Sequence, residues 1–519
     1  FPIIILQLQL LFTNYQMIVK THEVFWHERD GKNQPIFSVD VSWSGRIATA
    51  GADGAVRIWA MNADLTTNPS GANSTDPKNT DENRSLPDSP SQRCVRQLAC
   101  LHRHTQPVNQ VRFSPGTPEL IASVSDDTLI YVWKRSESDE PIKPTFGSND
   151  EGCEDSESWI IWRTLRGHVS DVTSLSWSPK STHLVSGEIQ HRIMIWDVNT
   201  GQALATLPGH SKFVKGVAWD PLGEFILSQS CDKTCMLYRI LDLDRKNQDV
   251  CELSQTLKSW RMPIPDHQGA VVFKTSDLFG DDTVLSYFRR GSWSPDGTYF
   301  VTPTGVYQNS ACTFVWHRKY LERPLYILPT VSNPTVAVSF CPILFRLHGE
   351  TAPKLDHNDA NRLPLPYRMV FAVASNHGSV MIYDTEQNSP IASISGLHFA
   401  QITDLSWSNS GLFLVVSSSD GYLSTIQFQS GELGQAISTA DLPPCLLQKK
   451  PSPTVLEASQ IVGGAKIISS SPIVEPSASA RLTPTQCQPR RITPMLVAAP
   501  STAESQPQPR RVPLIRVDP

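Results

Sequence analysis

The chain has 519 residues, of which 39% are hydrophobic, and 45 Lys and Arg against 50 Asp and Glu give a formal charge of −5. This length accommodates one large domain or several small ones. Without a basic excess, sequence-specific binding to nucleic acid is not the expected activity. The ten cysteines form no Cys-x-x-Cys pair, which argues against a zinc site and favours reduced thiols in an intracellular compartment.

The first residues, Phe1–Phe12, are apolar, but this stretch is shorter than the roughly 20 residues needed to span a bilayer. It also lacks the basic start and the small-residue cleavage site of a secretory signal. Because the sequence begins without Met and the repeat pattern starts just after Met17, we expect residues 1–16 to precede the natural start and to carry no function. No other segment is apolar enough to cross a membrane, so we expect no membrane partner.

Short runs with the period-two pattern of β-strands recur along the chain, and each ends in an aromatic residue. These runs are Ala55–Trp59, Leu129–Trp133, Arg192–Trp196, Thr234–Tyr238 and Ser379–Tyr383. Asp53, Asp127 and Asp232 each stand six residues before the aromatic residue of their run. A His stands 28 or 29 residues before it in three runs, at His104, His168 and His210. Further strands end in turns at Phe113–Pro115, Trp177–Pro179, Trp219–Pro221, Trp293–Pro295 and Trp407–Asn409.

This pattern resembles the WD-repeat family, whose four-stranded blades close into a ring. A single blade cannot bury both of its faces, whereas stacked blades in a ring do so and leave only short edges. The sequence therefore predicts an all-β, seven-bladed WD40 β-propeller over residues 17–428, and we expect a strand near Ile18–Phe25 to complete the last blade. The predicted blade centres are Val39–Trp59, Val108–Trp133, Val172–Trp196, Val214–Tyr238, Phe288–Trp316, Val336–Tyr383 and Ile402–Phe428.

The resemblance to the WD-repeat family implies that a set of polar residues bonds across each blade and holds its turn. The residues assigned to this blade network are His104, Ser123, Asp127, Trp133, His168, Trp196, His210 and Asp232. Gln190 is expected at the Asp position of the third blade and Tyr238 at the Trp position of the fourth. A His, Ser and Asp set could also belong to an active site, but this set repeats from blade to blade. With no phosphate-binding loop, paired-carboxylate cleft or metal-spaced His cluster, the sequence predicts no enzyme and no cofactor.

Two stretches interrupt the repeats. Residues 61–93 are rich in Asn, Ser, Thr, Asp and Pro, which predicts a mobile loop after the first blade. Residues 135–158 hold eight acidic residues against Arg135 and Lys143. This second stretch is interpreted either as a solvated mobile loop or as a contact for a basic partner such as a histone.

Several strings are similar to those of the WD-repeat middle subunit in the chromatin assembly factor 1 family. They are Thr164–His168, Val217–Gly223, Phe288–Arg290 before Trp293–Gly297, Leu365–Ser375 and Ser418–Tyr422. The Phe-Arg-Arg and Leu-Pro-Tyr-Arg strings carry most of this resemblance, because they are not part of a general blade. The opening Pro35–Asp40 is also similar to the related histone-regulator WD family, which shares the tail motif. That family carries a long folded C-terminal domain, which this sequence is not expected to contain.

Residues 429–519 contain no aromatic residue and are rich in Pro and Ser, which predicts a disordered tail. In both families the tail carries a box that binds the anti-silencing histone chaperone. The residues that this resemblance assigns to chaperone binding are Arg490, Arg491, Ile492, Thr493, Pro494, Met495 and Leu496, and in a shorter copy Arg510, Arg511, Val512 and Leu514. Paired guanidiniums form bidentate bonds with carboxylates, and an extended apolar stretch can add to a sheet edge. The alternative is a solvated or import-related Arg pair.

The resemblance implies a nuclear histone-chaperone subunit that helps pass histone H3–H4, directly or indirectly, to DNA in replication-coupled nucleosome assembly. Its partners would be the large and small subunits of chromatin assembly factor 1, bound by the propeller, and the anti-silencing chaperone, bound by the tail. One alternative is a replication-independent histone-deposition WD protein. Another is a WD40 substrate receptor of a ubiquitin ligase, but such propellers carry Trp-Asp-x-Arg where this chain has Trp196–Asn199.

Overall fold

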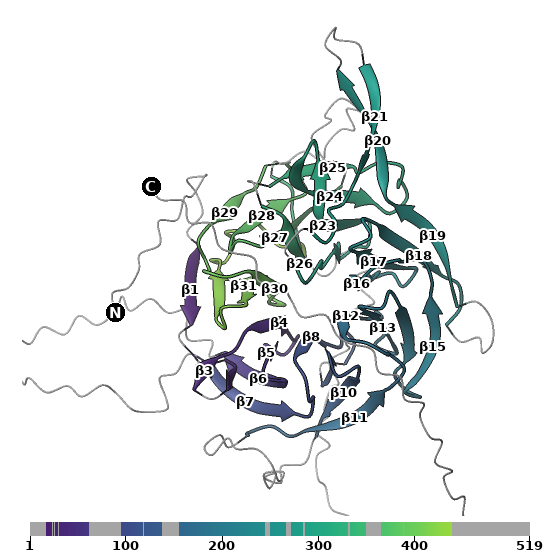
Figure 1. Cartoon of the computed structure of the whole chain (residues 1–519). Helices are drawn as coiled ribbons and strands as arrows, with labels where there is room; N and C mark the ends of the chain where they lie inside the picture. Colours follow the sequence, from purple (N-terminus) through teal and green to yellow (C-terminus); the bar gives the residue numbers. More distant parts are fainter. Residues whose placement is uncertain are drawn as a thin grey trace, which may run out of the picture. The chain divides into compact units, whose positions relative to one another are not determined.

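The structure is a computed structural model, and it describes residues 17–438 except 23, 25, 30, 62–94, 118, 137–154, 244–249, 266–270, 284–285, 331–332, 349–364 and 388. Figure 1 shows that the strands of this region form sheets that radiate from a common axis. Seven of these sheets have four strands each, which confirms the predicted seven-bladed propeller. Among the described residues, no helix has the length and apolar character needed to cross a membrane.

The blades follow one another along the chain, each from its inner to its outer strand. Blade 1 contains β4 (Ile36–Val41), β5 (Arg46–Gly51), β6 (Ala55–Met61) and β7 (Val95–His102). Blade 2 contains β8 (Val108–Phe113), β9 (Leu120–Ser125), β10 (Ile130–Arg135) and β11 (Trp159–Leu165). Blade 3 contains β12 (Val172–Trp177), β13 (His183–Glu188), β14 (Ile193–Asp197) and β15 (Gln202–Leu207). Blade 4 contains β16 (Val214–Trp219), β17 (Phe225–Ser230), β18 (Cys235–Ile240) and β19 (Cys251–Leu257).

The second half of the ring has the same order. Blade 5 contains β22 (Ser292–Trp293), β23 (Tyr299–Tyr307), β24 (Ser310–His317) and β25 (Tyr326–Pro329). Blade 6 contains β26 (Thr335–Phe345), β27 (Arg368–Ser375), β28 (Val380–Asp384) and β29 (Ala392–Ile394). Blade 7 contains β30 (Ile402–Trp407), β31 (Phe413–Ser418), β32 (Leu423–Gln427) and β1 (Ile18–His22). Two hairpins lie outside the blades, β2 (Glu28–Arg29) with β3 (Lys32–Asn33), and β20 (Ser259–Pro265) with β21 (Val271–Asp277). Figure 1 shows the second hairpin projecting from the ring.

The hydrophobic core lies between neighbouring blades. Every residue of β9 is buried, whereas the outermost strand β15 is buried only at its last residue. One core cluster combines Val132 of blade 2 with Leu175 and Trp177 of blade 3. The inner strands can therefore be apolar on both faces, because each is covered by two neighbours.

The last blade is closed by the N-terminal strand. β1 pairs antiparallel with β32, from Ile18 opposite Gln427 to His22 opposite Leu423. Side chains add to this pairing, since Thr21 Oγ1 lies 2.8 Å from Ser424 Oγ. The structure thus confirms that a strand from the start of the chain completes the propeller, and this strand covers the edge of β32.

The propeller extends beyond the boundary predicted at residue 428. Arg346 N donates to Gln435 O at 2.8 Å, and Ile437 N donates to Leu344 O at 2.9 Å. The fully buried Arg368 guanidinium donates to Leu433 O and also to Asp384 Oδ2, the latter at 2.9 Å. The structure corrects the boundary because residues 431–437, predicted as part of the tail, supply acceptors and a strand edge to blade 6. We call this segment the C-terminal strap.

Deleting residues 1–22 should lower the melting temperature by at least about 5 °C, because the edge of β32 would lose its partner strand. Thermal unfolding followed by circular dichroism measures this change. Deleting residues 1–16 is the matched control and should leave the melting temperature unchanged, since β1 begins at Ile18. Equal melting of the two deletions would contradict closure by β1.

Ending the chain after Phe428 should destabilise the propeller, whereas ending it after Ser438 should not. The shorter chain removes the carbonyl of Leu433 and leaves part of the buried Arg368 guanidinium without an acceptor. The loss of a hydrogen bond to a charged group costs roughly 1.5–3 kcal/mol. Urea denaturation of both chains measures the free energy of unfolding, and a stable 428-residue chain would show that the strap is dispensable.

Candidate functional site

The two faces of the propeller carry different loops. Neighbouring strands of a blade are antiparallel, so the turn between its first and second strands lies on one face. The turn between its second and third strands lies on the other face, together with the loop that enters the blade. We call this second face the His–Asp face, because the predicted blade-network histidines and aspartates lie there. The other is called the opposite face.

The four network residues predicted in blade 2 lie together. His104 Nδ1 is 2.9 Å from Asp127 Oδ2, and His104 Nε2 is 2.9 Å from Ser123 Oγ. Ser123 Oγ also accepts the indole N–H of Trp133 at 2.9 Å. Burial by itself would raise the pKa of Asp127, but the bond to His104 lowers it. The set connects the entry loop, the second strand and the third strand of one blade.

Blade 3 corrects the prediction for Gln190. His168 Nδ1 bonds to Glu188 Oε2 at 2.8 Å, and Ser186 Oγ bonds to both His168 Nε2 and the indole of Trp196. Glu188 is the last residue of β13, and its longer side chain reaches the His from the strand, whereas Asp127 reaches its His from the turn. Although burial favours the neutral acid, bonds to His168 and Arg192 hold the pKa of Glu188 at about 2.

Blade 4 carries the same network with a Tyr in place of the Trp. His210 Nδ1 is 2.9 Å from Asp232 Oδ2, and His210 Nε2 is 2.7 Å from Ser228 Oγ. The Tyr238 hydroxyl donates to Pro208 O at 2.9 Å. Burial would raise the pKa of Asp232, but the bond to His210 lowers it well below its ordinary value.

Two further His–carboxylate pairs were missed from the sequence. His27 bonds to Asp53 at 2.7 Å, and His398 bonds to Asp420 at 3.0 Å. His27 lies further from Trp59 than the spacing seen in the other blades, and the third strand of blade 7 has no Trp or Tyr at its end. Repetition in five blades identifies the network as an element of the blade rather than as a single reaction centre.

Three charged side chains from non-neighbouring blades meet on the axis. Arg112 of β8 donates to both carboxylate oxygens of Asp404 of β30, at 2.7 and 2.9 Å. Arg290, which precedes β22, also pairs with Asp404 and donates to the carbonyl of Asn109 at 2.7 Å. We call Arg112, Arg290 and Asp404 the axial ion cluster. It joins blades 2, 5 and 7, and sequence reasoning did not detect it.

Charge compensation maintains this buried cluster. Burial lowers the pKa of Arg290 to about 10, although Asp404 acts in the other direction. Burial alone would raise the pKa of Asp404, but the adjacent Arg112 and Arg290 guanidiniums lower it. The three groups are therefore ionised together at neutral pH, and the carboxylate offsets part of the cost of burying Arg290 and of partly burying Arg112.

Side chains of the inner strands also link each blade to the next around the axis. In each link a backbone N–H of one blade donates a hydrogen bond to a side-chain oxygen of the preceding blade. The pairs are Val39 with Asp404, Val111 with Ser38, Leu175 with Gln110, and Val217 with Ser174. The series ends at Gly216, where a Cβ would clash with the carbonyl of Arg289. Gly216 therefore permits the close approach of the Arg289–Arg290 segment, which replaces the first part of an inner strand in blade 5.

The two strings that carried the family resemblance have structural roles in this arrangement. Arg289 is fully buried and donates to the carbonyls of Ser230 and Gly280 at 2.8 and 2.7 Å. It thereby fixes the segment between blades 4 and 5, and places Arg290 on the axis. In the second string, the Tyr367 hydroxyl bonds to Asp296 at 2.8 Å, while Arg368 holds the C-terminal strap.

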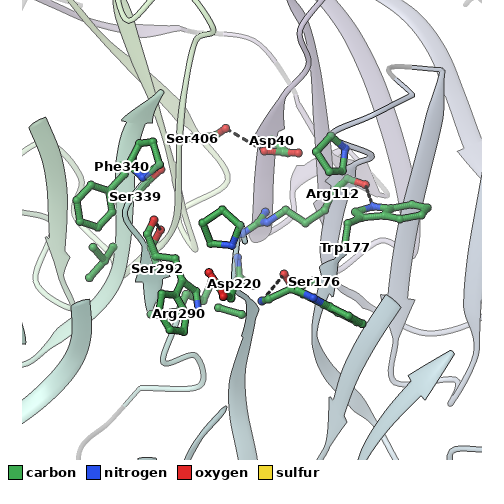
Figure 2. A pocket seen from close by; sticks show the side chains of 18 of the residues that line it. Asp40, Arg112, Ser176, Trp177, Asp220, Arg290, Ser292, Ser339, Phe340 and Ser406 are labelled. Carbon is green, nitrogen blue, oxygen red and sulfur yellow. Dashed lines mark hydrogen bonds between the residues drawn. The ribbon is translucent and has the colours of Figure 1, made fainter. Parts of the chain in front are cut away.

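A pocket of about 440 Å³ opens on the opposite face, beside the axial ion cluster. Figure 2 shows side chains from several blades around it, including Trp177, Phe340 and Arg112. Its wall is rich in aromatic residues and prolines, which are Trp43, Trp177, Trp219, Trp293, Phe340, Pro115, Pro179, Pro221, Pro295 and Pro342. We call this cavity the opposite-face pocket.

The Trp indole N–H groups near this pocket differ in whether they have a hydrogen-bond acceptor. Trp177 donates to Arg112 O, and Trp407 donates to Ser339 O, both at 3.0 Å and both across a blade boundary. Trp219 and Trp293 are equally buried and line the pocket, but their indole N–H groups find no acceptor among the described residues. A buried donor without a partner costs roughly 1–3 kcal/mol, and both of these indole nitrogens are inaccessible from the pocket.

The predicted chaperone-binding residues, Arg490 to Leu496 and Arg510 to Leu514, lie outside the described residues. The same holds for the insertion predicted at residues 61–93, except for Met61, which is the last residue of β6. Of the eight acidic residues predicted in the second insertion, the structure describes Asp155 and Glu157. Glu157 pairs with Arg46 at 2.6 Å, and Asp155 accepts the backbone N–H of Cys100 at 3.1 Å. These two carboxylates therefore connect the end of the insertion to blade 1.

Replacing Asp404 by Ala should lower the free energy of unfolding by roughly 3–5 kcal/mol, because the buried Arg290 and the partly buried Arg112 lose their shared carboxylate. Folding lowers the pKa of Asp404. Its contribution to the free energy of unfolding is therefore fully present above its unfolded-state pKa of about 3.9, and it is lost as the pH falls through its pKa in the folded protein. The difference in free energy of unfolding between wild type and Asp404→Ala, measured by urea denaturation, should therefore become smaller at acidic pH. Asp282→Ala, which breaks only an exposed pair with Lys212, should unfold like wild type. A similar loss in both variants would contradict the special role of the cluster.

Comparison with known proteins places these features in a family. Residues 88–433 match the CAF1B/HIR1 beta-propeller domain, and residues 24–60 match the WD domain, G-beta repeat. The chromatin assembly factor 1 B subunit of Mus musculus is 36% identical over 429 residues, which cover 80% of this chain and 68% of that protein. The corresponding B subunit of Saccharomyces cerevisiae is 29% identical over a match that covers 79% of this chain and 85% of that protein. Protein HIR1 of Yarrowia lipolytica is 28% identical over a match that covers 79% of this chain and 38% of that protein. The chain belongs to the CAF1B/HIR1 β-propeller family.

Proposed function

We propose that this chain is the WD-repeat subunit of a nuclear histone chaperone that assembles nucleosomes during DNA replication. The observation that carries the proposal is its similarity to the B subunits of chromatin assembly factor 1, with higher identity to the mouse protein and wider coverage of the mouse and yeast B subunits than of HIR1. In this role the chain is a scaffold and performs no chemical step. The repeated His–carboxylate networks and the axial ion cluster serve that role by making the ring rigid.

The propeller binds the large and small subunits of the complex. Its His–Asp face offers apolar contact area, because the entry loops of three blades expose large side chains beside the network histidines. Val169 is 57% exposed, Phe213 49% and Phe399 100%. Exposed apolar groups on a rigid frame are typical of protein-binding surfaces, since little conformational entropy is lost on contact. This surface supports the assignment of subunit docking to the propeller.

The C-terminal region recruits the anti-silencing chaperone, which supplies histone H3–H4. From Gln429 onward there are nine Lys and Arg against six Asp and Glu, so this region is basic in an otherwise acidic chain. Arg490 and Arg491 form bidentate bonds with carboxylates of the chaperone, while Ile492 and Leu496 bind in a groove beside one of its strands. The copy at Arg510 and Arg511 is shorter and contributes less.

Affinity purification from nuclear extract tests both parts of the proposal. The tagged wild-type chain should recover the large and small assembly-factor subunits, histones H3 and H4, and the anti-silencing chaperone. Arg490→Glu/Arg491→Glu should retain both subunits and lose at least about 90% of the chaperone, because two attractive contacts become repulsive.

The matched control is Arg510→Glu/Arg511→Glu, which makes the same charge change and should cause a smaller loss of chaperone. Recovery of a cullin ligase in place of the assembly-factor subunits would refute the proposed function. Full retention of the chaperone by the Arg490→Glu/Arg491→Glu variant would refute the assignment of the tail box alone.

A further inference from the structure

The outer strand of blade 2, β11, has an open edge at the rim of the ring. Figure 1 shows β11 on the outside of the propeller, and among the described residues it pairs only with β10. Ser136 N donates to Ser158 O at 2.8 Å, just before β11 begins. Hydrogen-bonded and non-hydrogen-bonded pairs alternate along an antiparallel ladder, so the backbone N–H and C=O groups of Trp159 and Ile161 point away from β10. These groups can bond with one more strand.

The open edge of β11 is unusually apolar. Ile160 is 52% exposed and Ile161 is 36% exposed, and the two residues are adjacent. The outer strands β7 and β15 expose no large apolar side chain, while β19 exposes only Leu253 and β1 only Ile18. The first four residues of β11, Trp-Ile-Ile-Trp, include no charged residue and no proline, which are the usual protections of an edge strand. An edge of this kind favours pairing with another strand.

The chain covers the neighbouring edge of blade 1 but not that of β11. Ser156 N and Glu157 N donate to Leu98 O of β7 at 2.9 and 3.0 Å. Cys100 N of the same strand donates to Asp155 at 3.1 Å. Residues 155–157 therefore lie along β7, and the chain then leaves that strand to form β11. Within the part of the chain that the structure describes, no strand covers β11 in the same way.

The edge of β11 is complementary to a second copy of itself. In an antiparallel pair of two β11 strands, the outward groups of Trp159 in one copy meet those of Ile161 in the other. This register places a twofold axis at Ile160, which then faces Ile160 of the second copy in a non-hydrogen-bonded pair. The side chains of such pairs lie closest to each other, so the two exposed isoleucines cover one another. A register with the axis at Trp159 would need Glu157 N, which is already bonded to Leu98 O.

The charges beside β11 favour the same antiparallel arrangement. Asp155 precedes the strand and Arg166 follows it, and both residues are exposed. With the twofold axis at Ile160, Asp155 of one copy lies beside Leu165 and Arg166 of the other. The symmetry repeats this attraction at the other end of the pair, whereas a parallel arrangement would bring like charges together.

We propose that β11 pairs with β11 of a second copy, so that the chain forms a twofold dimer through one continuous eight-stranded sheet. A bulge at Trp162 ends the regular pairing after a few residues, so the interface is small. Small interfaces are weak, and we expect a dissociation constant on the order of 1–100 μM. The two propellers meet at their rims, and the proposal does not depend on which histone-deposition complex the chain joins.

Sedimentation velocity of the purified full chain, from about 1 to about 200 μM, tests the dimer. Wild type should shift from monomer to dimer as the concentration rises. Ile160→Lys and Ile160→Glu should each remain monomeric, because two like charges would face each other across the twofold axis. An equal mixture of these two variants should contain more dimer than either variant alone at the same total concentration, because Lys then faces Glu.

The matched control is Leu253→Lys, which places the same charge on the outer strand of blade 4 and should dimerise like wild type. Melting temperatures measured by circular dichroism should be equal for all of these proteins. A wild-type chain that stays monomeric at every concentration would overturn the proposal and leave β11 to a strand of another protein. Dimerisation of Ile160→Lys like wild type, or no gain of dimer in the mixture, would also overturn it.

A disulfide provides a second test that fixes the register. Residues opposite each other in a non-hydrogen-bonded pair have Cα atoms about 4.5 Å apart, which is within the range of a disulfide. Mild oxidation of Ile160→Cys should therefore link the two introduced thiols, and mass spectrometry identifies the linked peptides. Leu253→Cys is the matched control and should give no link between its introduced thiols. Absence of the link in Ile160→Cys would refute a twofold axis at this residue.

Discussion

The axial ion cluster is the constraint on which the rest of the ring depends. The apolar packing of a blade reaches only the two blades beside it. Asp404, by contrast, pairs with Arg112 and Arg290 across the axis and so connects blades 7, 2 and 5 directly. Arg290 also forms backbone hydrogen bonds with Val336 and Val338 of blade 6. Breaking a buried pair leaves an uncompensated charge, so these contacts form or fail together. The ring is therefore fixed at its centre as well as between adjacent blades.

Both ends of the propeller sequence are held to the ring by different interactions. The start of the chain is bound by strand pairing, since β1 completes the sheet of blade 7. The end is bound by a short backbone pairing with β26 and by a buried cation, because Arg368 donates to the strap at Leu433 and balances its charge with Asp384. Blade 6 and blade 7 thus depend on segments that come from outside the seven repeats.

The two faces offer different chemistry to other molecules. The His–Asp face combines rigid, repeated polar networks with exposed side chains such as Val169, Phe213 and Phe399. The opposite face has a concave wall of aromatic residues and prolines, and it receives the strap. A scaffold that separates its surfaces in this way can hold subunits on one side and direct its C-terminal region from the other.

The sequence by itself determined the features that arise from local patterns. Period-two runs and their turns predict each blade, and the shortage of a fourth strand in the last blade predicts its closure by residues near Ile18. The box at Arg490–Leu496 is likewise visible only as sequence. The Phe-Arg-Arg and Leu-Pro-Tyr-Arg strings could be recognised as unusual, but their roles could not be derived from the sequence.

Only the tertiary structure decided which distant residues meet. Arg112 and Asp404 are 292 residues apart, and nothing in their local sequence distinguishes them from other charged residues on inner strands. In blade 3, the partner of His168 is Glu188 rather than Gln190, because the longer Glu188 side chain reaches the His168 ring from β13. The opposite-face pocket and the path of the strap follow from the closed ring, because the inner strands face one another only after the last blade has been completed.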